Sequence, residues 1–145
     1  MKTATQRIAL AVLLMTATGS LFSAPAFAQT ASADNGPVFE LRTYKATPGN
    51  MDKLLERFRQ HTMRLFEKHG MTNIGYWIPT DPELAEDTLI YLLRHDSQAA
   101  ADASWRAFGS DPEWQQVNAD SNRDGNILGS VVRQYLSPTD FSQIQ

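Results

Sequence analysis

The stretch "VFELRTYKATPGNMDKLLERFRQHTMRLFEKHG", Val38 to Gly70, changes its hydrophobic period once, and that change decides the fold. From Val38 to Tyr44 the side chains alternate between two sets, as they do in a β-strand. After the turn residues TPGN, apolar side chains recur at helical spacing. Asn50 is a predicted N-cap and Gly70 a predicted helix stop, so we expect a helix from about Met51 to His69.

Downstream, the sequence predicts three more strands and a second, broken helical segment. The strands are expected at Met71–Pro79, Thr88–His95 and Ile127–Leu136, with an acidic turn between the first two. The helical segment begins after a cap at Asp96 or Ser97, and it breaks at Asp111, which is expected to cap a short helix starting at Pro112. Its apolar stripe is expected at Ala100, Ala103, Trp105 and Phe108.

The order of elements, βαββαβ, is that of the ferredoxin-like fold, an α+β class with a four-stranded antiparallel sheet. Right-handed crossovers place both helical segments on one face of this sheet. We expect the other face to carry Tyr91, Leu93, Val131 and Tyr135, which is too apolar for a surface in water. A second copy would cover it and close a dimeric α/β barrel, so the sequence predicts a homodimer.

The first residues have the layout of a secretory signal. Lys2 and Arg7 precede a short apolar run, and Ala26-Phe27-Ala28 is a typical cleavage site. We therefore expect a signal peptide at 1–28, a flexible leader at 29–36 and the folded domain at 37–143, with a periplasmic or secreted location. An uncleaved anchor is the alternative, but the run is shorter than the roughly 20 residues that span a bilayer, so no stable membrane anchor is expected after cleavage.

Composition excludes several classes of function. Loss of Lys2 and Arg7 with the signal would change the net charge from −3 to −5, which argues against a nucleic-acid partner. The chain has no cysteine, so neither a disulfide nor a thiol nucleophile is available. Neither a Gly-rich phosphate loop nor a G-x-S-x-G elbow is present in the sequence.

The stretch "DSNRDGNIL", Asp120 to Leu128, imitates the first half of a calcium-binding EF-hand loop. The twelfth position, however, is Val131 instead of a bidentate glutamate, and a strand follows where a helix should be. We therefore predict a polar helix end with Gly125 in a left-handed turn. The three histidines, His61, His69 and His95, lack the spacing of zinc ligands, and we predict no metal and no cofactor.

Several segments together resemble the NIPSNAP family. They are "FELRTYKATPGNMDKLLERF", "HTMRLFEKHGMTNIGYW", the W-x-x-F-x-x-D-P-x-W pattern from Trp105 to Trp114, and "PTDFS" from Pro138 to Ser142. The resemblance implies the dimeric α/β-barrel superfamily, which includes cofactor-independent monooxygenases, haem-degrading enzymes and small-ligand isomerases. It implies no single reaction. Better-known members resemble mitochondrial proteins, and the predicted export signal argues against carrying those roles over.

A cluster of polar residues is expected on one side of the sheet. Glu40, Arg42 and Tyr44 share a face of the first strand, and Arg133 and Tyr135 share a face of its expected neighbour. Such a cluster would hold an anionic or enolic ligand, with Glu40 as a general base. The alternative is an ion pair of Glu40 with Arg133 or Arg42 that fixes the strand register.

Three further residues complete the predicted site. His61 lies at the edge of the apolar stripe of the first helix, where it would carry a proton or serve as a half-buried hydrogen-bonding residue. Trp77 and Tyr91 are predicted to line the ligand pocket. The most favoured function is binding of a small, partly apolar or anionic molecule. The alternatives are a cofactor-free monooxygenase or isomerase using His61 or Glu40, a haem-related protein, and a protein-interaction module around Trp105 to Trp114.

Overall fold

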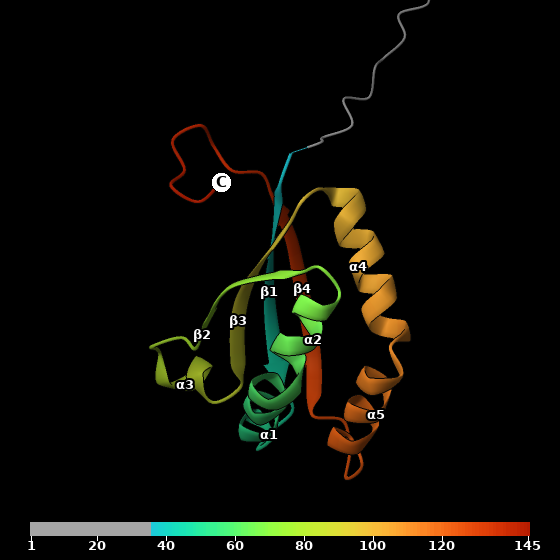
Figure 1. Ribbon diagram of the computed structural model, residues 1–145. Coiled ribbons are helices and arrows are strands. Elements are labelled where there is room, and N and C mark those ends of the chain that lie inside the picture. The colour runs from blue at the N-terminus through green and yellow to red at the C-terminus, as the bar shows by residue number, and fades with distance from the viewer. Residues whose placement is uncertain (1–35) are drawn as a thin grey trace, which may run out of the picture. The chain divides into compact units, whose positions relative to one another are not determined.

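The structure of this chain, a computed structural model, describes residues 36–145 (Figure 1). The predicted signal peptide, its cleavage site and all but the last residue of the predicted leader lie outside the described residues. The elements are β1 Val38–Ala46, α1 Met51–Arg57, the π-helical segment η1 Phe58–Thr62, α2 Met63–Lys68, β2 Thr72–Trp77, α3 Pro82–Ala85, β3 Thr88–His95, α4 Gln98–Ser110, α5 Pro112–Ser121 and β4 Leu128–Leu136. None of the helices in this part of the chain has the length and apolarity needed to span a bilayer.

The four strands form one antiparallel sheet in the order β2-β3-β1-β4, which confirms the predicted ferredoxin-like α+β fold. In this register Arg42 on β1 lies between Tyr91 on β3 and Arg133 on β4. Paired residues point to the same face. The polar residues predicted for one face of β1 and β4 therefore share that face.

The assignment of residues to the two faces of the sheet differs from the prediction. Tyr91 and Leu93 are fully buried in the core beneath the helices, and Val131 and Tyr135 share that face because they pair with Tyr44 and Glu40. Alternation separates the two sets of side chains but does not say which set the helices cover. The open face instead carries these apolar residues: Leu41, Ile90, Leu92, Val132 and Leu136.

The first helix runs as predicted from Met51, but it contains a π-helical turn at its centre. Within that turn the Thr62 hydroxyl donates to the Arg57 carbonyl five residues earlier, at 3.2 Å. The amide of Asn50 bonds to Thr47 instead of capping the helix. Gly70 ends the helix with φ of +77°, as predicted, because this left-handed conformation is strained for other residues.

The second helical segment begins and breaks where the sequence predicts. Ser97 caps α4 by accepting the Ala100 N–H, and Asp111 caps α5 by accepting the Glu113 N–H at 2.8 Å. Of the predicted apolar stripe, Phe108 is buried and Trp105 packs against the core, but the two alanine positions are displaced by one residue. The buried positions of α4 are Ala101, Ser104 and Phe108. Ser104 is small enough for α4 to approach the end of α2, where a Cβ on Gly70 would stand 3.6 Å from the Ser104 hydroxyl.

An aromatic cluster fills the space between the helices and the sheet. The Tyr91 ring lies at its centre, 5.1 Å from the Tyr44 ring and 5.2 Å from the Phe58 ring. Phe66 and Phe108, 5.1 Å apart, continue the cluster toward α4 and α5. These contacts hold η1, α2 and α4 over the sheet. The cavities described next lie beside this cluster, between the first helix and α5.

Candidate functional site

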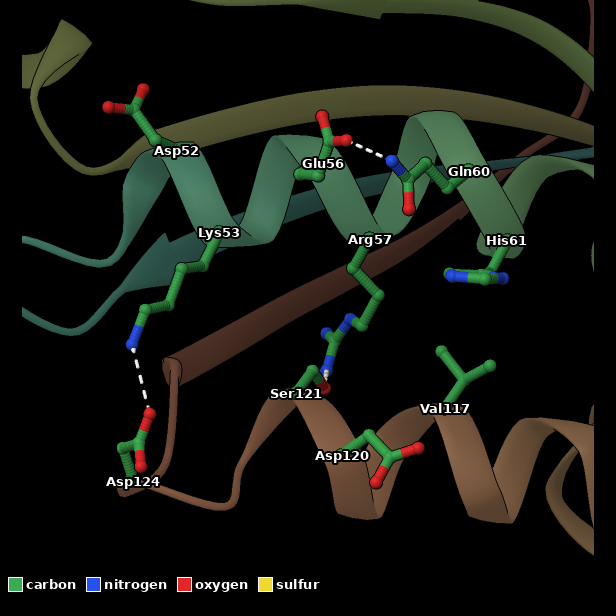
Figure 2. A pocket seen from close by; sticks show the side chains of 10 residues that line it. All are labelled: Asp52, Lys53, Glu56, Arg57, Gln60, His61, Val117, Asp120, Ser121 and Asp124. Atoms are coloured by element: carbon green, nitrogen blue, oxygen red, sulfur yellow. Dashed lines mark hydrogen bonds and ion pairs between the residues drawn. The ribbon is translucent and has the colours of Figure 1, made fainter.

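Arg57, the last residue of α1, is buried without an acidic partner. Its side chain is directed from α1 toward α5 (Figure 2), and the residue is only 5% exposed. Nη1 donates to the Ser121 hydroxyl at 3.1 Å and reaches the Asn118 side-chain oxygen at 3.4 Å. Among residues 36–145 no carboxylate forms an ion pair with this guanidinium, whereas a buried arginine normally has one.

Part of the hydrogen-bonding capacity of Arg57 is unused. The buried Nε has no partner in the described part of the chain, and the hydrogen bonds that Arg57 donates all come from Nη1. The guanidinium carbon lies 5.2 Å from the centre of the Trp114 ring, which holds its plane in place. Burial lowers the pKa of Arg57, while the nearby hydroxyls of Tyr44 and Tyr91 act in the opposite direction. Nε and Nη2 together form the free edge of Arg57, the edge through which an arginine binds a carboxylate by two hydrogen bonds. Because Nε is enclosed by protein atoms, side chains around it would have to move to admit an oxygen.

Arg57 lines two hollows between the first helix and α5. The outer groove, of about 600 Å³, is bounded by α1, η1 and α5, as Figure 2 shows. The inner cavity, of about 150 Å³, is more enclosed, and its wall combines five aromatic residues with Arg57, one threonine, one leucine and three asparagines. Its lining includes Tyr44, Phe58, Phe66, Phe108 and Trp114. A ligand that touches Arg57 can therefore extend into either a polar or an apolar space.

His61 lines the outer groove, as the sequence suggested when it placed this residue beside a pocket. It comes from η1, and Figure 2 shows its ring above Val117 of α5. π-Helical turns are rare and are frequent at functional sites, because the extra residue redirects the side chains around it. The same groove carries four acidic side chains: Asp52, Glu56, Asp120 and Asp124.

Glu40 lies away from both hollows, in a buried network. One of its carboxylate oxygens accepts from Arg42 Nε at 2.8 Å, and the other from His95 Nε2 at 2.9 Å and Trp105 Nε1 at 2.5 Å. The guanidinium of Arg42 stacks on Trp105 at 3.8 Å and donates to the Tyr44 hydroxyl at 2.9 Å. Because Glu40 is completely buried and its oxygens accept these bonds, we do not include it in the ligand site.

The other predicted ligand residues are dispersed. Arg133 is exposed on β4, 5.3 Å from the ring of half-buried Tyr135, and neither residue lines the two hollows. Trp77 is 51% exposed on the edge strand β2, where its ring covers Gly75. Tyr91 lies in the core behind Tyr44. Only Tyr44 and His61 of the predicted residues contact a hollow that Arg57 also lines.

The sequence reasoning missed Arg57 and Phe58 as site residues. A signal was present, because Arg57 follows Leu54 by three residues and precedes Phe58 directly, and both of those residues are buried. An arginine beside an apolar stripe usually extends its charge into water. Only the packing of α5 over this residue reveals that its charge is enclosed.

The EF-hand-like stretch is a helix end and a turn, as predicted. Asp120 pairs with Arg123, and the Asn122 side-chain oxygen accepts the Ile127 N–H at 2.9 Å. Gly125 has φ of +130°, inside the region that favours glycine. The oxygens that would face a calcium ion are therefore used to end α5 and start β4, and the described residues contain no cluster of three potential metal ligands.

Comparisons with known proteins agree with this fold. The NIPSNAP family model matches residues 39–143. Among solved structures, a NIPSNAP family protein from Agrobacterium tumefaciens is 21% identical over 75% of this chain and 99% of that chain, with a TM-score of 0.66. A NIPSNAP-like domain protein from Burkholderia xenovorans is 17% identical over 74% of this chain and 90% of that chain, with a TM-score of 0.64.

A more distant structure is SnoaB, described as a cofactor-independent oxygenase from Streptomyces nogalater. It is 9% identical, covers 76% of this chain and 99% of that chain, and has a TM-score of 0.50. At such identities the likeness concerns the fold alone. None of the curated proteins compared matches the chain.

Proposed function

Because this chain belongs to the NIPSNAP family, a membership that establishes its fold but no reaction, we propose its function from the site itself. The protein binds a small molecule that has one acidic group and an apolar body. The acidic group pairs with Arg57, and the body occupies the hollows on either side of it. The single observation that carries this proposal is a guanidinium that is 5% exposed and has no carboxylate partner.

The energetics favour an anionic ligand over a purely structural role for Arg57. Removing an ion from water costs several kcal/mol, and proteins recover this cost through a counter-charge and a full set of hydrogen bonds. Arg57 has two neutral acceptors, Asn118 and Ser121, and one aromatic ring beside it. A bound carboxylate would supply both the missing charge and acceptors for Nε and Nη2.

A search for co-purifying acids tests this proposal. The purified protein is denatured, and the released small molecules are identified by untargeted mass spectrometry. Wild type and Arg59→Gln are expected to release the same organic acid, and Arg57→Gln to release none. Arg59 is the matched control, because it lies two residues further along the helix, with a side chain that is 69% exposed and paired with Glu56. Equal amounts of acid from all three proteins would contradict the proposal, as would the absence of any organic acid from the wild type.

A second candidate function is an enzyme in which His61 transfers a proton to or from the bound molecule. It is favoured by the position of His61 in η1, on the groove that Arg57 also lines. The fold likeness to SnoaB is compatible with it. In this case the wild type would convert the co-purifying acid, and mass spectrometry would detect the product. The His61→Gln variant would still bind the acid but would not convert it. If the wild type converts nothing, binding alone is the function.

We also propose that the chain is exported and that the mature protein is a homodimer. Export rests on the signal-like residues 1–28, and it would give a mature chain beginning at Gln29 after expression in a bacterial host.

Dimerisation rests on the apolar side chains of the open sheet face, two of which, Val132 and Leu136, are 57% and 43% exposed. A protein-interaction role for the acidic surface and the broken helix around Trp105 to Trp114 would apply if no ligand is found.

A further inference from the structure

We infer that the ligand is a monocarboxylate carrying a single aromatic ring, with the ring in the inner cavity and the carboxylate on the free edge of Arg57. The inference rests on the proposed function and narrows it to one chemical class. It follows from three properties of the site: the volume of the inner cavity, the chemistry of its walls and the charges of the outer groove.

The volume of the inner cavity sets the size of the apolar group. At about 150 Å³ it equals the apolar cavities that hold one benzene molecule. A two-ring group is too large for it without displacement of core side chains, and displacement of close-packed side chains is costly. A methyl or ethyl group would leave most of the cavity empty. The volume therefore selects a single ring.

The walls of the inner cavity favour an aromatic ring over an aliphatic group of the same size. Phe108 and Trp114 lie 4.4 Å apart at an interplanar angle of 33°, and Tyr44 meets Phe58 edge to face at 5.8 Å. A guest ring can continue this arrangement, because offset and edge-to-face pairs add to the energy of burial. The polar part of the wall is mostly occupied, since Asn122 bonds to Asn118 and to the Ile127 N–H. Sugars and other hydroxyl-rich molecules would find few free partners there.

The outer groove limits the charge of the ligand to one. Arg57 provides the buried positive charge, but the groove also carries Asp52, Glu56, Asp120 and Asp124. Asp120 is paired with Arg123, Asp124 with Lys53 at 3.7 Å and Glu56 with Arg59 at 2.7 Å. Asp52 has no ion pair among the described residues, so its negative charge still repels a second anionic group. A phosphate ester or a dicarboxylate is therefore disfavoured, and a monocarboxylate has the charge that Arg57 can neutralise.

Titration calorimetry with five probes tests the inference on the full chain: benzoate, acetate, benzene, 1-naphthoate and phenyl phosphate. Benzoate is expected to bind at least about tenfold more tightly than acetate, because acetate leaves the cavity empty. Naphthoate and phenyl phosphate are expected to bind at least about tenfold more weakly than benzoate, for reasons of size and charge. Benzoate binding should fall at least about tenfold in Arg57→Gln and stay unchanged in Arg59→Gln, whereas benzene binding should survive in both.

The outcomes separate this inference from the proposed function. If acetate or phenyl phosphate binds as tightly as benzoate and each depends on Arg57, the anion site stands and the single-ring class is overturned. Naphthoate binding as tight as that of benzoate overturns it in the same way. If no acid shows a difference between wild type and Arg57→Gln, both proposals fail. Leu128→Phe narrows the inner cavity, so it should weaken the binding of benzoate and leave the binding of acetate unchanged. Equal effects on the affinities for the two acids would also overturn the single-ring assignment.

Discussion

The carboxylate of Glu40 and the imidazole of His95 are joined by a hydrogen bond of 2.9 Å, with both side chains fully buried between the sheet and α4. Since His95 Nε2 faces an acceptor, it carries the proton, and the buried Nδ1 has no partner among the described residues. Arg42 and Trp105 add their donors to the same carboxylate. One acidic side chain thus links β1, β3 and α4, which gives Glu40 a structural position and not a place in either hollow.

Glu40→Gln should lower the free energy of unfolding by roughly 3 kcal/mol, because it removes one partner of a buried ion pair and leaves Arg42 without its counter-charge. Urea unfolding followed by circular dichroism measures this loss. Glu56→Gln is the control, since the side chain of Glu56 is 50% exposed, and it should change stability by no more than about 0.5 kcal/mol. Equal stabilities of the two variants would mean that the buried network contributes nothing.

Stability should fall on acidification in the range below the ordinary carboxyl pKa values. Burial raises the pKa of Glu40, but the hydrogen bond from His95 and the charge of Arg42 outweigh it, so the pKa lies below the usual 4.5. Hydrogen bonds from Lys68 and His69 likewise hold the pKa of Asp111 well below its usual 3.8. The unfolded chain then binds protons more readily than the folded one, so this stabilisation is complete above pH 4.5 and is lost as the pH falls through the lowered values. The urea midpoint of unfolding should fall between pH 7 and pH 3, and it should fall less in Glu40→Gln than in the wild type. An equal fall in both proteins would contradict the lowered pKa of Glu40.

Arg57→Met should leave the stability of the ligand-free protein unchanged or raise it by about 1 kcal/mol. This is the opposite of the usual effect of changing a buried residue, and it follows because the substitution removes a charge that has no counter-charge. Arg42→Met is the matched comparison: the Arg42 side chain is 12% exposed and is paired with the fully buried Glu40, so its loss should cost roughly 3 kcal/mol. Thermal unfolding of protein stripped of small molecules measures both. A large loss of stability in Arg57→Met would mean that Arg57 serves mainly to hold α1 against α5.

The mature protein should have the mass of two chains in light scattering at micromolar concentration. Val132→Lys places a charge on the open sheet face and should give a single-chain mass without loss of secondary structure. Leu84→Lys, at a 44% exposed position on α3, should leave the mass unchanged. A wild-type protein that scatters as one chain would remove the homodimer.

The sheet could be predicted from the sequence because period-two alternation and strand order determine which side chains share a face. That β1 and β4 are neighbours follows from that order, whereas the register that pairs Arg42 with Arg133 and Glu40 with Tyr135 is known from the structure. The choice of face does not, because reversing both faces leaves the alternation unchanged. Tyr91 and Leu93 were therefore assigned to the open face, although the helices bury them.

The site was less predictable than the fold, because it depends on which charge remains without a partner. The sequence suggested an ion pair of Glu40 with Arg133 or Arg42, and the structure contains the pair with Arg42. It also suggested that His61 faces a pocket, which it does. Arg57 could not be singled out, since its partners Asn118 and Ser121 lie more than sixty residues later in the chain. Their distance from Arg57 is fixed by the packing of α5.

The π-helical turn at Phe58–Thr62 makes the length of the first helix a determinant of the site. A π turn takes up one more residue than an α turn, while the α-helical segments on both sides keep their directions. Deleting one residue from this turn would therefore restore regular winding with Leu54 and Phe66 still in the core and Arg57 still beside Trp114. The side chains of the turn itself would be re-aimed, so the extra residue determines how His61 is presented to the groove, separately from the anion site.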